Sequence, residues 1–124
     1  MSTQRFDDTF APHGMLALRD LSIEAAPGDT VVCRARFSAG PRDFDLSATA
    51  SGPIGAMSEM LYGMGAGVEI VSLSQQDDDG QVTTYLLCER DSRRCWSYGR
   101  ARRGDESAVH ALIAGANQLA PVAG

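Results

Sequence analysis

The sequence predicts an α+β domain made of two βββα units, each with a three-stranded sheet covered on one face by its helix. Six short segments alternate apolar and polar residues between Gly, Pro and Asp turn signals. Two longer segments carry apolar residues at helical spacing, one after each set of three strands. The two halves, which meet near Gly65–Gly67, are similar in this order of elements.

The first unit begins with a strand over residues 16–24, where Leu21 and Ile23 alternate with polar neighbours. A turn at 27–29 leads to a second strand over 30–38, and Gly40-Pro41 separates it from a third over 42–50. A sheet covered by helices on one face is a common α+β solution.

The first helix follows the third strand. Ser51 is the expected cap of its free N–H groups, and Pro53 suits the first turn because its missing donor costs nothing there. Glycines at 63, 65 and 67 are expected to end the helix. The predicted buried stripe consists of Ile54, Met57, Met60, Leu61 and Met64.

The second unit repeats this order, with strands over 68–74, 81–89 and 94–102. Residues 75–80 are expected to form a solvated acidic turn. A helix then begins near Gly104, has acidic residues at its positive end, and ends before Pro121. Its apolar stripe is Val109, Leu112, Ile113, Ala116 and Leu119.

Length and charge limit the domain organisation and the partners. The 124 residues suffice for one domain, predicted over 14–121 as units 14–66 and 67–121 after a flexible lead-in over 1–13. A net charge of −5 disfavours nucleic acid and anionic membranes as partners. No apolar run approaches the ~18 residues of a membrane span. No signal peptide is evident at the N-terminus, so a cytoplasmic location is expected.

The cysteines and histidines point to no metal site and no cofactor. Cys33 and Cys88 fall in strands, where free thiols behave as small apolar residues, and no ligand pair has close spacing. A reactive pair of Cys95 with His110 stays open as an alternative.

Three strings, in order, resemble the C-terminal regulatory domain of the α-isopropylmalate synthase and citramalate synthase family, also called the LeuA dimerisation domain. Residues 50–56, Ala-Ser-Gly-Pro-Ile-Gly-Ala, match the family's opening of the first helix, with Ala50 in place of its first Gly. Residues 96–99, Trp-Ser-Tyr-Gly, match a strand. Residues 107–117 match the last helix and end on Asn117, which is expected to satisfy a loop backbone group near the helix end.

The resemblance implies a homodimer that binds a pathway end product, such as leucine, as feedback inhibitor. The catalytic barrel of those synthases is absent from this chain, so a separate synthase subunit is a further implied partner. The implied ligand is an amino acid or a related small acid, with its carboxylate at the first helix's N-terminus. The residues that the resemblance assigns to this pocket are Gly52, Pro53, Ile54, Gly55, Val71 and Leu73.

The residues themselves leave two alternatives open. Apolar residues on the second sheet faces, at Val32, Val71 and Leu87, indicate a homodimer and are equally compatible with a purely structural dimerisation module. A dimer-pocket enzyme of secondary metabolism would need an acid/base set such as Glu59, Asp45, His110 or Tyr62. Trp96 is expected in the core or at an interface.

Overall fold

The computed structural model, which describes residues 16–39 and 41–119, confirms the predicted α+β class and the order of elements. The first unit comprises β1 (Leu16–Ala26), β2 (Thr30–Ala39), β3 (Arg42–Ala50) and α2 (Pro53–Gly63). Its strands form an antiparallel sheet, here called sheet A, in the order β1-β2-β3. The predicted lead-in over 1–13 and the helix stop at Pro121 lie outside the described residues.

The second unit repeats the architecture with β4 (Glu69–Asp78), β5 (Gln81–Arg90), β6 (Arg93–Ala101) and α3 (Gly104–Leu119). Its antiparallel sheet, sheet B, has the order β4-β5-β6. Both sheets are simple meanders because each strand pairs with its neighbour in the chain. α2 and the segment after it connect β3 of sheet A to β4 of sheet B.

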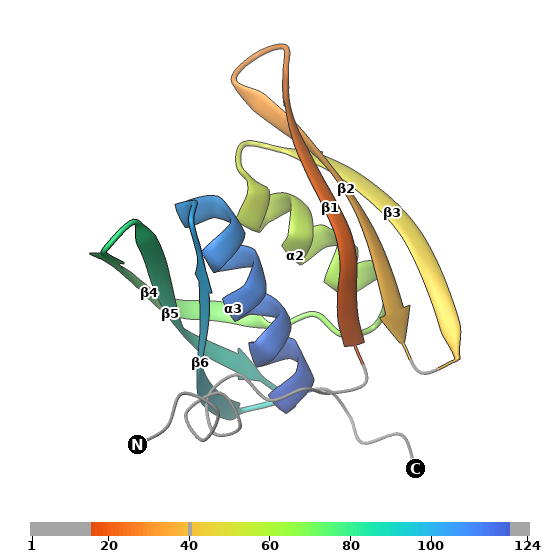
Figure 1. Ribbon diagram of the computed structural model, residues 1–124. Helices are drawn as coiled ribbons and strands as arrows, with labels where there is room; N and C mark the ends of the chain where they lie inside the picture. The colour runs from red at the N-terminus through yellow and green to blue at the C-terminus, as the bar shows by residue number, and fades with distance from the viewer. Residues whose placement is uncertain (1–15, 40, 120–124) are drawn as a thin grey trace.

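The helices lie between the two sheets, so the molecule has three layers (Figure 1). α2 packs on β2 and β3, and α3 packs on β5 and β6. The helices also touch each other, and α3 reaches β1 of the first unit. The buried core therefore joins both units, and it includes Phe37, Met57, Leu61, Leu86 and Leu112.

Glycine sets how closely α3 lies on sheet B. A Cβ on Gly99 of β6 would stand 2.3 Å from the Ser107 carbonyl oxygen and 2.4 Å from the Ala111 nitrogen. A Cβ on Gly115 of α3 would stand 2.6 Å from the Cys88 sulfur. Real Cβ atoms do not approach this closely, so helix and strand are in backbone contact.

A chain of hydrogen bonds fixes the start of α3. The Gln75 amide donates to the Thr84 hydroxyl (2.9 Å), which lies 2.6 Å from the Ser107 hydroxyl. The Ser107 hydroxyl donates in turn to the Gly104 carbonyl (2.8 Å). Thr84 and Ser107 are fully buried, and their polar atoms are satisfied inside the protein.

Asn117 ties the two units together. Its side-chain Oδ1 accepts from the Leu16 N–H at 3.0 Å, and its Nδ2 donates to the Leu16 carbonyl at 2.8 Å. The amide thus continues the strand pairing at the start of β1 from the end of α3. The expectation that Asn117 satisfies a backbone group is confirmed, but that group belongs to strand β1 and not to a loop.

Two local expectations are wrong. The N-cap of α2 is Gly52, in extended backbone and with no side-chain cap, whereas Ser51 is exposed. The predicted turn over 75–80 is mostly strand, because β4 runs to Asp78 and the turn itself is Asp79-Gly80. Both turn residues have positive φ, which suits the twist of a two-residue hairpin.

Candidate functional site

The N-terminus of α2 is open. A Cβ on Gly52 would meet nothing within 4 Å, and this N-cap residue makes no side-chain bond to the first N–H groups. Pro53 occupies the start of the helix, and the Ala56 N–H closes the first turn on the Gly52 carbonyl at 3.1 Å. Ile54 is half-buried and Gly55 is exposed. The geometry leaves N–H groups free to meet an anion from solvent.

The other two residues assigned to the pocket lie on the edge strand β4. Val71 is 43% exposed and Leu73 is 46% exposed. α2 packs on sheet A and α3, whereas β4 belongs to sheet B. Within the part of the chain that the structure describes, neither of the two depressions reported below includes any of the six assigned residues.

β4 is the most exposed strand described. Nine of its ten residues are exposed. Leu73 pairs with the buried Leu86 and so shares the face of sheet B that α3 covers farther along. The principal contacts of α3 are with β5 and β6, so this part of the helix-facing side remains open at β4. β4 meets α3 at the first residue of the helix, where Gln75 Nε2 donates to the Gly104 carbonyl at 3.2 Å, and Leu73 is left 46% exposed.

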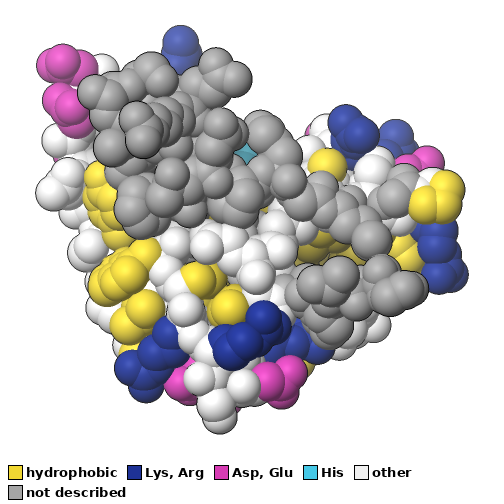
Figure 2. Space-filling model, turned by 90° about the horizontal axis from the view of Figure 1, so that it is seen from below, with side chains coloured by type: hydrophobic (Ala, Val, Ile, Leu, Met, Phe, Trp, Pro, Cys, Tyr) yellow, Lys and Arg dark blue, Asp and Glu magenta, His cyan; other side chains and the backbone are white. Residues whose placement is uncertain are grey.

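The outer face of sheet B is aromatic. Tyr85 lies opposite Tyr98, with ring centroids 6.3 Å apart, and Leu87 lies opposite Trp96. Trp96 is 48% exposed, so of its two expected places the core is excluded, and the interface stays a prediction. Seen from below, hydrophobic side chains reach the surface between charged ones (Figure 2).

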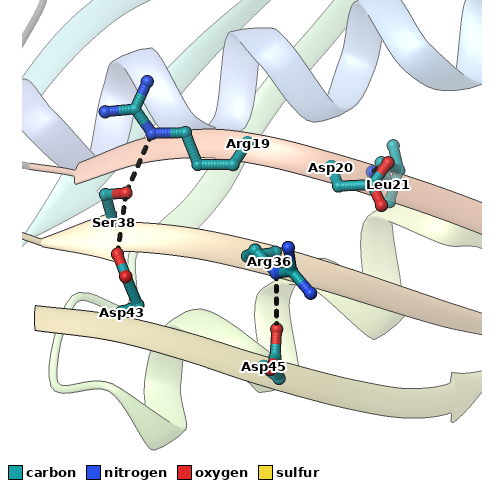
Figure 3. Close-up of polar contacts among 7 residues, drawn as sticks. All are labelled: Arg19, Asp20, Leu21, Arg36, Ser38, Asp43 and Asp45. Atoms are coloured by element: carbon teal, nitrogen blue, oxygen red, sulfur yellow. Dashed lines mark hydrogen bonds and ion pairs between the residues drawn. The ribbon is translucent and has the colours of Figure 1, made fainter.

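The outer face of sheet A is charged instead. Arg36 donates to Asp45 at 3.0 Å, and Arg19 donates to Ser38, whose hydroxyl donates to Asp43 (Figure 3). Val32 lies on this face and is half-buried. The rows of charge line a shallow depression of about 410 Å³ that is open to solvent. Exposed pairs of this kind contribute only about 0–1 kcal/mol each.

Most of the arginines in and beside β6 have hydrogen-bond or ion-pair partners within the chain. Arg90 donates to the Gly67 carbonyl at 3.0 Å, and Arg93 donates to the Leu119 carbonyl at the end of α3 at 2.8 Å. Arg94 pairs with Glu89 at 2.9 Å, and Arg100 donates to Thr83. These four arginines therefore have a structural role in linking strands, turns and the end of α3.

No residue proposed for catalysis is brought to a common site. Asp45 points from the outer face of sheet A, opposite the side on which α2 carries Glu59 and Tyr62. His110 is exposed on α3 beside Gly99, whereas the Cys95 thiol lies near the Gly115 carbonyl. The acid/base set is thus not gathered in one place, because Asp45 lies apart from Glu59 and Tyr62, and the Cys95 thiol has the Gly115 carbonyl rather than His110 beside it.

The thiols are protonated at neutral pH. Burial raises the pKa of Cys33, Cys88 and Cys95, that of Cys95 to about 11. Asp105 raises the pKa of Cys33 further, and the nearby Cys88 thiol adds to the rise at Cys95. Cys33 and Cys88 are fully buried, as predicted.

A depression of about 520 Å³ lies where the end of α2 meets the β5–β6 turn, and it is lined in part by Tyr62, Glu69 and Arg90. Sequence reasoning missed it. Tyr62 was singled out only as an acid/base candidate, and no local pattern links it to Glu69 or Arg90. The cavity depends on two segments that meet only in the fold.

Neither a metal centre nor a membrane span emerges from residues 16–39 and 41–119. No three His, Cys, Asp or Glu side chains among them could hold a metal ion together. Neither described helix has the length and apolar character needed to cross a bilayer.

No family model matches the chain, and no curated protein is similar to it.

Proposed function

We propose that this chain is a regulatory module that forms a homodimer and binds an amino acid or a related small acid, with the chemistry carried by a separate synthase. The proposal starts from the three sequence strings that resemble the regulatory domain of the α-isopropylmalate synthases. The duplicated βββα fold agrees with that resemblance. The separation of the acid/base candidates favours binding over catalysis.

The observation that carries the proposal is the exposure of β4. This edge strand presents unpaired backbone groups, and an apolar residue on its helix-facing side is nearly half exposed. Such an edge is a template for pairing with another chain. A second copy that pairs with β4 would cover Leu73, which is 46% exposed in the single chain.

The ligand part of the proposal is supported by the open end of α2. Gly52 lets a ligand approach the backbone because no Cβ occupies the space in front of the helix. N–H groups at a helix N-terminus, together with the helix dipole, favour a carboxylate. In this proposal the ligand bridges α2 of one protomer and β4 of its partner, which unites Gly52 with Val71 and Leu73.

Sedimentation tests the dimer. We expect a dimer for the wild-type chain and a monomer with unchanged circular dichroism for Leu73→Asp. The matched control is Gln76→Asp, a change in the same exposed strand at a position that pairs with Thr83 on the outer face. A monomeric wild-type chain, or a Leu73→Asp chain that still dimerises, would contradict dimerisation through β4.

A thermal-shift screen of the amino acids and of small hydroxy and oxo acids tests the ligand. A ligand at a hundred times its dissociation constant adds about 2.7 kcal/mol to the free energy of unfolding. Gly52→Asp should abolish this gain, because its side chain occupies the space in front of the helix and repels an anion, whereas Gly63→Ala at the other end of the same helix should keep it. A dimer that responds to no compound would identify the chain as a purely structural dimerisation module.

A further inference from the structure

The cavity at the end of α2 has the dimensions of a small-molecule site. Its volume of about 520 Å³ falls within the range of roughly 300–1,000 Å³ typical of ligand pockets. One wall is the end of α2 with the segment after it. The other is the end of β5 with the β5–β6 turn.

Two contacts hold the two walls of the cavity together, and both involve Gly67. The Tyr62 ring lies directly on the backbone of Gly67, where an added Cβ would stand 2.3 Å from a ring carbon. Arg90 donates to the Gly67 carbonyl at 3.0 Å, which joins β5 to the same residue. The ring nevertheless leaves Tyr62 56% exposed, so one side of it is free to receive a ligand.

The charges that line the cavity are not balanced. Glu69 and Glu89 lie directly opposite each other on β4 and β5, an arrangement in which like charges repel. Arg94 pairs with Glu89 at 2.9 Å, and Arg90 lies 3.8 Å from Asp91. Among the described residues, no cationic side chain forms an ion pair with Glu69.

We infer that this cavity binds a small organic cation, a primary amine or a guanidinium on a short carbon chain. Glu69 neutralises the cation, and the exposed side of the Tyr62 ring supplies a cation–π contact and an apolar surface for the chain. The cation removes the repulsion between Glu69 and Glu89. This inference is independent of the proposed function, because none of the six residues assigned above lines the cavity.

NMR titration with pentylamine tests the inference, and the neutral isostere 1-pentanol serves as the matched probe. We expect saturable shifts of the backbone amides of Tyr62, Glu69 and Asp91 with pentylamine, and none that saturate with 1-pentanol. High salt should weaken the binding, because the pair at Glu69 is exposed to solvent.

Three variants locate the site. Glu69→Gln should weaken pentylamine binding about fivefold, the value of an exposed ion pair. Tyr62→Leu should weaken it about two- to fivefold, the value of an exposed cation–π contact. Glu24→Gln, which removes a carboxylate paired with Arg34 on sheet A, should leave it unchanged. Each variant is checked for folding by its own amide spectrum.

The inference is overturned if pentylamine causes no saturable shift at these amides, or if 1-pentanol produces the same shifts. Equal affinity of Glu69→Gln and the wild-type chain would also overturn it. An amino-acid response in the thermal-shift screen that persists in Glu69→Gln would leave the proposed function standing, so the two failures are distinguishable.

Discussion

Replacing Asn117 with alanine should loosen the junction between the two units. The Asn117 amide makes two hydrogen bonds to the backbone of Leu16, at 3.0 and 2.8 Å, and Leu16 is buried. The change therefore removes two bonds and leaves two backbone groups without partners.

The magnitude follows from these two bonds. Each neutral hydrogen bond contributes about 1 kcal/mol net, and an unsatisfied buried group costs about 1–3 kcal/mol. Alanine recovers a few tenths of a kcal/mol in helix propensity. We therefore expect Asn117→Ala to lower the free energy of unfolding by about 2–4 kcal/mol, a large part of the ~5–15 kcal/mol typical of a domain.

Urea unfolding followed by circular dichroism measures this loss. His110→Ala is the matched control, because it makes a similar change in propensity at an exposed position of the same helix. Asn117→Asp should fall between the two, since it keeps an acceptor for the Leu16 N–H and loses the donor. An Asn117→Ala chain within 0.5 kcal/mol of the control would refute the role of this amide.

Three further changes test other parts of the fold. Gly99→Ala should lower the free energy of unfolding by about 3 kcal/mol, because the new methyl group would meet the backbone of α3. Gly63→Ala is its control in the same urea assay, because a Cβ at that position meets no atom within 4 Å. Similar losses of stability in both variants would count against the close contact between β6 and α3. Ser92→Gly should stabilise by about 0.5–1 kcal/mol, since Ser92 has a φ of 65° that glycine adopts without strain; an unchanged melting temperature would contradict this. Burial raises the pKa of the Cys95 thiol from 9.0 to about 11, so folding favours the protonated thiol. The contribution of this thiol to the free energy of unfolding is therefore complete below pH 9 and is lost as the pH rises through 11. Cys95→Ala should flatten this part of the melting-temperature profile, and identical profiles would show that the thiol does not titrate there.

The order of elements was predictable because each segment carries its own signals. Alternation gave the strands, and the apolar spacing in α2 and α3 gave the helices. β4 was predicted too short because residues 75–78 are polar and acidic, which is typical of a turn. Their strand conformation depends on pairing with residues 81–84, and such pairing is a tertiary effect.

The candidate sites were less predictable. Nothing local to Tyr62 or Glu69 shows that they meet, because the Gly67 backbone and Arg90 bring the two walls together. The exposure of Trp96 could not be predicted either, since a tryptophan in a strand is compatible with either face of the sheet. For the pocket implied by the resemblance, the assigned residues lie at the start of α2 and on β4, and in our proposal a second copy unites them.

The position of α3, in contact with β1 as well as with its own sheet, bears on how this architecture arose. A polypeptide half as long, with three strands and one helix, would leave the far side of that helix bare. It would persist only as a pair of identical molecules at sufficient concentration. With both units on one chain the encounter is intramolecular, so the shared interior forms at any protein concentration.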